Sequence, residues 1–412
     1  MAIIGRIPRR CVNLPPGALG TLISSALSGK VVEGPAVDKF YQKFGDWLGI
    51  PHVFGAASGR SAFLLALQAL GLEKGKEIIF PVFTFPVMPM VAKMLGYRPV
   101  FSEVAPDTYN SGPEHIAPLI NQNTGAVLAT HLFGKPCPIA EIAELTRDKN
   151  IRLMEDCAHA CGVRVGGRPV GTFGDVAIFS FAEGKNMPCF GGGAIATADD
   201  EVAHRAADIL LHAPAPSKGA VLKKALEIWL KWLVTRPEVF GVTLYPILRL
   251  KSLLGQTLLD SAVGDKLLEA FADSDPQVEP LVNLQAKIGL RQLQRIDAFN
   301  QGARKNARIL TEGLEGISDI GVPRSENDDH IYVYYPLTVE PSRRDDLRRY
   351  LLKHGFDTKI TDMSDCSQLK PFRGDDRPQE RHGPRETSIL EICVYPVIPE
   401  KNIRRLAQVI RN

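Results

Sequence analysis

Two short apolar runs in the middle of the chain, residues 151–154 and 176–181, end in polar residues. We predict that both runs are buried strands, because each is short, apolar and bounded by polar or turn-forming residues. Parallel strands of an open α/β sheet present their ligand sites at their carboxyl ends. The polar side chains at the ends of these runs should therefore meet at one place. They are Asp156, His159, Ser180 and Lys185.

A lysine beside a carboxylate suits the chemistry of pyridoxal 5'-phosphate (PLP). The amine of Lys185 would form an internal aldimine with the cofactor aldehyde. The carboxylate of Asp156 would pair with the pyridinium nitrogen, so that the ring withdraws electrons. Taken singly, Lys185 also fits a solvated charge, Asp156 a cap after a strand, and His159 a buried core histidine.

A candidate phosphate seat lies upstream in residues 55–71, where glycine and small residues precede a run rich in alanine and leucine. The start of a helix offers free N–H groups and the positive end of the helix dipole, and both favour a phosphate. Gly59 and Arg60 lie in this turn. The same pattern also fits an ordinary capped helix after a turn.

A sheet must position these residues, and the chain alternates between predicted strands and helices. Two helices are expected within residues 14–48. Strands are predicted at 77–80, 98–104, 125–131 and 151–154, and helices at 88–95 and 140–149. This alternation favours the α/β class, with a mostly parallel mixed sheet flanked by helices.

Residues 205–275 differ from the rest of the chain. The run 220–234 is apolar except for one narrow stripe at helical spacing, and it holds Trp229 and Trp232. Neither this run nor the apolar stretch after Pro237 gives about twenty uninterrupted apolar residues, so no membrane span is predicted. A helix on a membrane surface and a helix buried under another domain or subunit both stay open, and the second is favoured. The stripe consists of Lys223, Lys224, Glu227 and Lys231.

The remainder predicts a smaller α+β domain. A long helical pattern covers 284–314, strands are predicted at 331–339 and 390–395, and helices at 343–354 and 399–410. We therefore predict three segments. They are a large PLP-binding domain at 1–212, an apolar helical insertion at 213–280, and a small C-terminal domain at 281–412 that opens with the long linking helix.

Composition narrows the class of protein. The 412 residues carry 49 basic and 46 acidic side chains, a net charge of +3, which does not indicate a nucleic-acid footprint. The seven cysteines form no CxxC pair, so no metal site is expected. We interpret Cys157, Cys161 and Cys189 as packing residues of a reduced, cytoplasmic protein. The first ten residues lack the apolar core of a signal peptide.

Six motifs between about residues 28 and 200 stand out by their order and spacing. They are S-G-K-V-V-E-G-P, A-S-G-R-S-A, F-P-V-F-T-F, H-L-F-G-K-P, E-D-C-A-H-A and G-R-P-V-G-T-F-G-D-V-A-I-F-S-F-A-E-G-K-N. In these motifs the chain resembles the DegT/StrS-type sugar aminotransferases, which are PLP enzymes of fold type I, and the likeness is weaker from residue 284 to the end. The resemblance implies a fold type I large domain, a smaller C-terminal domain and a homodimer with its site at the subunit interface.

The resemblance implies a role for each matching residue. Lys185 falls on the lysine that holds PLP and moves the proton between substrate and cofactor, and Asp156 falls on the partner of the ring nitrogen. His159 stands where the family carries Gln or His beside the ring and its phenolic oxygen. The other matches are Ser180 as a phosphate ligand, Gly59 and Arg60 in the phosphate-binding turn, and Phe85 as the ring that stacks on the cofactor. Phe85 alone also fits plain core.

Other positions depart from the family. Arg60 stands where the family usually has threonine, and Ser61 is the candidate replacement for its hydroxyl. The family's Gly-Tyr-Asn-Tyr-Arg run supplies an Asn to the partner subunit's cofactor phosphate, but this chain reads D-P-Q-V-E-P-L-V-N there. Gln277 and Asn283 are both open as its replacement. The substrate loop expected after Gly355 also differs, so the cofactor half is retained while the substrate half is rewritten.

These observations predict a PLP-dependent aminotransferase. The donor is expected to be glutamate, and the acceptor is first of all a nucleotide-linked keto sugar. Two alternatives stay open: a lipid-linked or membrane-proximal acceptor, with membrane contact through residues 220–259, and a PLP-binding homologue that acts as a regulator. A dehydratase of the same family is disfavoured, because those enzymes carry histidine where this chain has Lys185.

Overall fold

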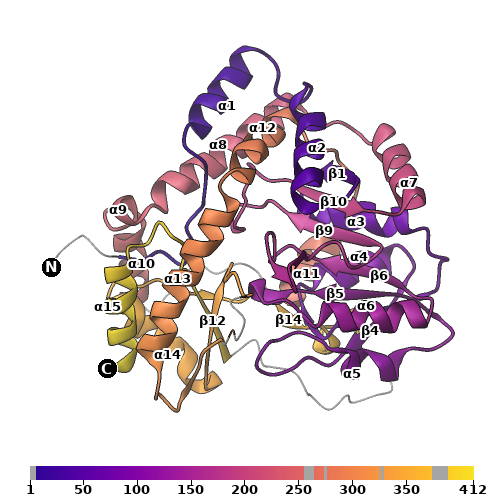
Figure 1. The fold of residues 1–412 in the computed structure, drawn as a ribbon. Helices are drawn as coiled ribbons and strands as arrows, with labels where there is room; N and C mark the ends of the chain where they lie inside the picture. Colours follow the sequence, from indigo (N-terminus) through magenta and orange to yellow (C-terminus); the bar gives the residue numbers. More distant parts are fainter. Residues whose placement is uncertain (1–5, 255–263, 273–275, 324, 326–328, 374–387) are drawn as a thin grey trace.

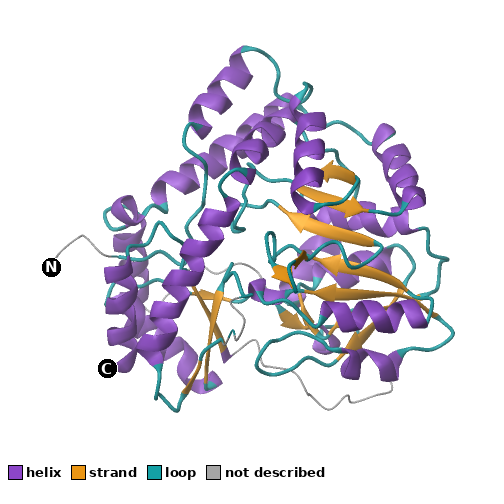
Figure 2. Ribbon diagram, viewed as in Figure 1, coloured by secondary structure: helices purple, strands orange, loops and turns teal. Residues whose placement is uncertain are grey.

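The computed structural model describes residues 6–254, 264–272, 276–323, 325, 329–373 and 388–412. It contains a seven-stranded sheet and a smaller four-stranded sheet, with helices around both (Figure 1, Figure 2). The large sheet is built from the first half of the chain and the small sheet from the last quarter.

The large sheet has the strand order β1-β10-β9-β6-β5-β2-β4. Strands β9, β6, β5, β2 and β4 run parallel to one another, whereas β10 and β1 add antiparallel pairings at one edge. The predicted α/β architecture with a mostly parallel mixed sheet is therefore confirmed. The strands span β1 His52–Ala56, β2 Glu77–Pro81, β4 Arg98–Ser102, β5 Thr124–Thr130, β6 Arg152–Asp156, β9 Val176–Ser180 and β10 Gly193–Thr197.

Helix α3 (Gly59–Leu70) shows why this sequence forms a buried helix against the sheet. Ser58 caps its start by accepting a hydrogen bond from Ser61 N, and Gly71 ends it in the left-handed conformation. Its alanine and leucine side chains are buried, so the helix is covered nearly all round. The other helices of this half are α1 Ala18–Leu27, α2 Ala36–Leu48, α4 Val87–Met94, α5 Pro113–Ile116, α6 Ile139–Asp148 and α7 Asp200–Leu211.

The small sheet has the order β11-β12-β15-β13 and is antiparallel. The predicted strand at 331–339 begins only at Tyr335, because the four preceding residues are buried but leave the ladder, with Tyr332 at a positive φ of 50°. The strands are β11 Ile320–Gly321, β12 Tyr335–Val339, β13 Lys359–Ile360 and β15 Ile389–Ile392, and the helices are α14 Pro341–Lys353 and α15 Glu400–Arg411.

The helical pattern predicted at 284–314 is in fact two helices, α12 (Asn283–Leu293) and α13 (Ile296–Leu314). The break has a packing reason. Helix α12 packs against α2 beside the large sheet, whereas α13 packs against α15 of the small domain. The backbone leaves helical geometry between the two at Arg295, with φ −123° and ψ −8°.

The N-terminal segment belongs spatially to the small sheet. Ile7 forms a parallel bridge with Phe356, and the Arg9 guanidinium bonds both carboxylate oxygens of Asp357 at 2.7 and 2.9 Å. Ile7 is also part of the small-domain core. Residues 6–11 thus link the two parts, and the division of the chain at 212 and 280 stays a prediction.

Between α7 and α12 lies the segment predicted as an apolar insertion. Helix α8 packs against α1 and leads into α9, as Figure 1 shows. Trp229 and Trp232 of α8 are half-buried against the main core and lie 6.2 Å apart between ring centroids. No helix within the described residues is long and apolar enough to cross a membrane. The helices here are α8 Lys218–Val234, α9 Pro237–Phe240, α10 Leu244–Leu253 and α11 Asp265–Ala272.

Candidate active site

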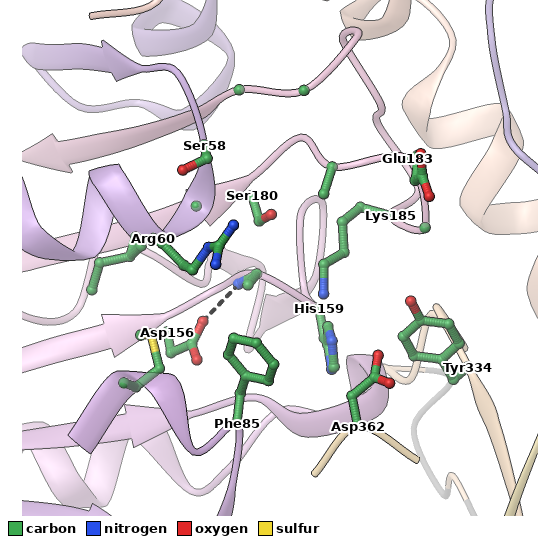
Figure 3. Close-up of a pocket in the computed structure, with 18 of the residues that line it drawn as sticks. Ser58, Arg60, Phe85, Asp156, His159, Ser180, Glu183, Lys185, Tyr334 and Asp362 are labelled. Carbon is green, nitrogen blue, oxygen red and sulfur yellow. Dashed lines mark hydrogen bonds between the residues drawn. The ribbon is translucent and has the colours of Figure 1, made fainter. Parts of the chain in front are cut away.

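A cavity of about 470 Å³ lies at the carboxyl ends of β5, β6 and β9, where these strands face the small domain. Its lining includes every site residue that the sequence pointed to, and Figure 3 shows most of them around the central space. The structure therefore brings the predicted set together, while the role of each member stays a prediction. The set is Gly59, Arg60, Phe85, Asp156, His159, Ser180 and Lys185.

Asp156 ends strand β6 and is only 7% exposed. Its Oδ1 accepts a hydrogen bond from the backbone N–H of Ala158 at 3.0 Å, which fixes the carboxylate (Figure 3). Burial raises the pKa of Asp156, although the Ala158 N–H and the Lys185 charge act in the opposite direction. A cation placed beside this carboxylate would be held strongly, because few other groups solvate it.

His159 is 6% exposed and its Nδ1 accepts a hydrogen bond from the backbone N–H of Phe133 at 3.2 Å. Burial lowers the pKa of His159 well below its ordinary value, and the charges of Lys185, Lys359 and Arg10 lower it further. The ring is therefore neutral at pH 7. Since Nδ1 is an acceptor, Nε2 carries the proton and is the donor of this imidazole.

The start of α3 forms a tight corner against the end of β9. A Cβ on Gly59 would lie 2.8 Å from both Cβ and Oγ of Ser180, so only glycine lets the helix approach this closely. Gly59 and Arg60 supply the first N–H groups of the helix, which have no acceptor within it. Together with the hydroxyls of Ser58 and Ser180, they make an anion seat at one end of the cavity.

The structure corrects the expectation for Ser61. Its hydroxyl donates to Glu279 O and accepts from Glu279 N, so it is occupied by the backbone and does not line the cavity. Ser58, one turn earlier, provides the hydroxyl at this seat, and its N-cap position was the signal that could have indicated it. The Arg60 side chain reaches towards the cavity, and its guanidinium carbon lies 5.9 Å from the Phe271 ring centroid.

Lys185 lies in the turn after β9, and its Nζ points into the cavity between the two sets of polar residues in Figure 3. Burial lowers the pKa of Lys185 to about 8, with contributions from the charges of Arg10 and Lys359, although Asp156 and Asp362 oppose the shift. A substantial fraction of this amine is therefore neutral near physiological pH. A neutral amine is the nucleophilic form.

Phe85 follows the two-residue strand β3 (Phe83–Thr84), which pairs with β14 (Ser364–Asp365). Its ring is half-buried and faces the cavity between Asp156 and His159 in Figure 3. This position fits a ring that stacks on a planar ligand better than plain core. By contrast, Cys157, Cys161 and Cys189 are buried in the main core, as the sequence interpretation expected.

We call the residues at the ends of β6 and β9 and at the start of α3 the strand-end wall, and the facing residues from the rest of the chain the small-domain wall. The sequence analysis missed the second wall completely. Its polar groups come from four distant segments, and none of them carries a local motif. The small-domain wall consists of Arg10, Tyr334, Asp362 and Glu391.

The charged groups of the small-domain wall form a buried cluster with Lys359. The Lys359 ammonium donates to Asp362 Oδ2 at 2.6 Å and to Glu391 Oε2 at 3.0 Å. Arg10 approaches Asp362 only to 3.8 Å. Burial raises the pKa of Glu391, while the Lys359 charge opposes that shift.

Helix α8 contributes the charged stripe that the sequence showed at helical spacing. Lys224, Glu227 and Lys231 line the cavity, and Lys231 Nζ bonds both carboxylate oxygens of Glu183 at 2.9 Å. The stripe therefore faces the site, while Leu226 and Leu230, each 47% exposed, face outward. The half-buried Trp229 and Trp232 do not form the outer face of this helix.

Neither candidate for the family's phosphate-binding Asn lines the cavity of its own chain. Asn283 is fully buried at the start of α12, where its Oδ1 accepts from Ala36 N and its Nδ2 donates to Lys30 O. Both ends of this amide are thus used in holding α12 to the N-terminal helices. Gln277 is exposed.

A family model matches most of this chain. The family model described as the DegT/DnrJ/EryC1/StrS aminotransferase family matches residues 18–225 and 280–411. The N-terminal segment before residue 18 and most of the segment from α8 to α11 lie outside that match.

Individual relatives cover nearly the whole chain. A UDP-N-acetyl-3-dehydro-alpha-D-glucosamine 3-aminotransferase from Acidithiobacillus ferrooxidans is 27% identical over 369 residues, which are 88% of this chain and 85% of that protein. A protein named pleiotropic regulatory protein from Geobacillus stearothermophilus is 25% identical over 350 residues, or 84% and 80% of the two chains. The crystal structure of NtdA from Bacillus subtilis with bound cofactor PMP shares the fold. Its TM-score is 0.72 at 21% identity, with 96% of this chain and 81% of that chain covered.

Proposed function

The chain belongs to the DegT/DnrJ/EryC1/StrS aminotransferase family, and we propose that it uses PLP to move an amino group from glutamate to a nucleotide-linked keto sugar. The observation that carries the proposal is the placement of Lys185 Nζ and the Asp156 carboxylate in one cavity with a helix N-terminus. The nucleotide-sugar acceptor follows from the printed activity of the Acidithiobacillus relative.

The residues present fit PLP in shape and charge. The anion seat of Ser58, Gly59 and Ser180 would take the phosphate, because unpaired N–H groups and hydroxyls converge there. The buried Asp156 carboxylate, whose second oxygen is not bonded to Ala158, would pair with the protonated ring nitrogen. Phe85 would lie against the ring face. When bound, PLP supplies an aldehyde that condenses with amines and a ring that withdraws electrons.

Lys185 would do two tasks in succession. Its neutral amine would hold the cofactor aldehyde, and the same Nζ would move a proton at the substrate carbon. The lowered pKa, about 8, suits both tasks, since the amine must gain and lose a proton near pH 7.

His159 would act as a donor rather than as a base. Its Nδ1 is occupied by the Phe133 N–H, so the Nε2–H is the group available to the phenolic oxygen of the cofactor. The low pKa keeps this imidazole neutral, and the hydrogen bond from the Phe133 N–H selects its tautomer.

An absorbance spectrum tests the proposal. The purified protein incubated with PLP should show a visible band that disappears on addition of glutamate, and borohydride should attach the cofactor covalently to the peptide containing Lys185. A Lys185→Ala variant with the same band would refute the assignment of the lysine. If the wild-type band persists with every amino acid tested, the aminotransferase proposal fails.

A regulatory role is the second candidate, because one relative carries the name pleiotropic regulatory protein. In that case the protein would bind PLP and keep the visible band in the presence of amino donors. The complete set of cavity residues favours the enzyme.

A membrane-proximal acceptor is a variant of the first proposal, and the exposed side chains of Leu226 and Leu230 are the feature that supports it. Liposome flotation of the wild type and of a Leu226→Ser/Leu230→Ser variant tests it, and no wild-type flotation would end it. The Trp229→Ala/Trp232→Ala variant is a poorer probe, because both rings pack against the core.

The proposal also includes a homodimer, which light scattering after size-exclusion chromatography would detect.

A further inference from the structure

We propose that Arg10 binds a carboxylate of the amino donor, and this inference rests on the proposed aminotransferase function. Arg10 lies in the small-domain wall of the cavity, in the N-terminal segment that precedes the part of the chain matched by the family model. Its role is therefore argued from the geometry of this chain alone.

The residues that precede Arg10 hold this part of the chain in place. Ile7 is bonded to the backbone of Gly355 and Asp357, and Arg9 forms a two-pronged ion pair with Asp357. These contacts anchor the segment, so that Arg10 projects into the cavity instead of remaining on a free terminus. An anchored arginine loses less conformational freedom when a ligand binds.

Gly184 brings Arg10 close to the reacting lysine. A Cβ on Gly184 would lie 2.9 Å from Arg10 Cζ and 2.7 Å from the Tyr334 hydroxyl, so any larger residue would displace both. Gly184 immediately precedes Lys185 in the chain. The guanidinium of Arg10 therefore lies beside the turn that carries the amine. Arg10 Cζ and Lys185 Nζ each lie 5.9 Å from the centroid of the Tyr334 ring.

Arg10 also has an unused hydrogen-bond donor on this wall. Its Nε is buried and has no hydrogen-bond partner among the residues that the structure describes. Its contacts to Asp362 and Glu183 are 3.8 and 4.0 Å, which are longer than hydrogen bonds. A buried donor without a partner is costly unless a ligand or water satisfies it.

The neighbouring cations are already committed. Lys359 donates to two carboxylates and Lys231 to both oxygens of Glu183, all at 3.0 Å or less. Among the described cations Arg10, Lys359 and Lys231, Arg10 is therefore the one that can supply short bonds to an incoming anion without breaking an existing short pair. A guanidinium presents parallel N–H groups that match the two oxygens of a carboxylate.

The acidic neighbours of Arg10 explain how one cavity could bind first the amino donor and then the keto sugar. When no carboxylate is bound, Asp362 and Glu183 lie near enough to balance the charge of Arg10. They are too distant to hold it by hydrogen bonds, so a donor carboxylate can take their place. A sugar ring that carries no charge would leave this resting arrangement intact.

Donor half-reactions of the PLP-loaded enzyme test the proposal. The cofactor spectrum is followed with glutamate and with propylamine, an amine without a carboxylate, for the wild type, Arg10→Gln and Arg10→Lys. We expect Arg10→Gln to raise the half-saturating glutamate concentration roughly 10- to 100-fold, the range of lost charge-assisted hydrogen bonds. Its half-saturating propylamine concentration should stay within about 2-fold of the wild-type value. The half-saturating glutamate concentration of Arg10→Lys should lie between those of the wild type and Arg10→Gln, because lysine keeps the charge but lacks the two parallel N–H groups.

Equal losses with glutamate and propylamine would overturn the proposal, since they would indicate a structural role. A loss confined to the keto-sugar half-reaction would also overturn it and would place Arg10 in the acceptor subsite. Arg164→Gln, on the exposed β7–β8 hairpin (Arg164–Val165 and Arg168–Pro169), is the matched control and should leave both responses unchanged.

Binding of glutarate separates this inference from the proposed function. Glutarate is a dicarboxylate without an amine, and calorimetric titration measures its binding without any reaction. Binding by the wild type that is lost in Arg10→Gln supports the carboxylate site even if no amino donor reacts. Equal glutarate affinity in both proteins would refute it even if the enzyme transaminates.

Discussion

The two walls of the cavity are held in different ways. On the strand-end wall, backbone groups fix the titratable side chains: Ala158 N–H binds Asp156, and Phe133 N–H binds His159. On the small-domain wall, side chains hold one another, as Lys359 does with Asp362 and Glu391. Backbone positioning suits one permanent ligand, whereas side-chain pairs can rearrange, which suits two substrates that bind in turn.

The largest loss of activity is expected when Lys185, which lies between the two walls, is replaced. Lys185→Ala should lower transamination by about 10⁴-fold, because it removes both the attachment point and the proton carrier. Steady-state kinetics measure the loss. Lys223→Ala, an exposed position on α8 that does not line the cavity, is the control and should retain full activity.

On the strand-end wall, Asp156→Asn should reduce turnover by roughly 10²-fold, since an amide cannot hold the ring nitrogen in its charged form. PLP should still bind, because the anion seat and Lys185 are intact. Fluorescence titration with PLP alongside kinetics distinguishes these two effects. A variant with unchanged turnover would mean that Asp156 does not face the ring nitrogen.

A glycine pair tests the rigidity of the anion seat. Gly59→Ala places a Cβ 2.8 Å from Ser180 and should weaken PLP affinity by about 10-fold, since overpacking costs on the order of 1–3 kcal/mol. Gly20→Ala, in α1, meets nothing within 4 Å and should leave affinity unchanged. Equal affinities for all three proteins would show that the corner between α3 and β9 is not the seat.

The pH dependence of PLP capture compares the walls directly. The pKa of Lys185 is lowered to about 8, so the amine is protonated below this pH and neutral above it. The rate of capture by the apoenzyme should therefore rise through about pH 8 and then level off. Arg10→Gln removes a charge that disfavours the ammonium and should move the midpoint upward, whereas Asp156→Asn should move it downward. Stopped-flow absorbance measures the capture rate of each variant against pH. Midpoints that move in the same direction in both variants would contradict the opposite effects of Arg10 and Asp156 on the pKa of Lys185.

The smallest effect, a change in the free energy of unfolding, is expected at the ion pair between Lys231 of α8 and Glu183. Lys231 is 53% exposed, so Lys231→Ala should change the free energy of unfolding by less than about 1 kcal/mol, as for other exposed pairs. Urea denaturation measures this change. A larger destabilisation would show that α8 depends on the pair, rather than on Ala225 and Ile228, for its position.

The sequence by itself determined the sheet and the strand-end wall. Asp156 and Ser180 end two parallel strands that pair with each other, and Lys185 lies in the turn after the second strand. A parallel sheet places the ends of such strands together whatever the rest of the fold does. For this reason these three residues line one cavity, and the start of α3 and the segment after β3 add Gly59, Arg60 and Phe85 to it. Within the anion seat the prediction named Ser61 instead of Ser58. The N-cap position of Ser58 was a local signal, whereas the bond that occupies the Ser61 hydroxyl is made with Glu279, more than 200 residues away.

Only the tertiary structure decided the small-domain wall. The small-domain wall is assembled by the anchoring of the N-terminal segment to the small domain and by contacts between the two parts, such as the pairing of β3 with β14. The orientation of α8 was likewise undecided, because its charged stripe fits a solvated face as well as a cavity. Side chains far apart in sequence leave no periodic signal, since their proximity is set by packing rather than by local backbone geometry.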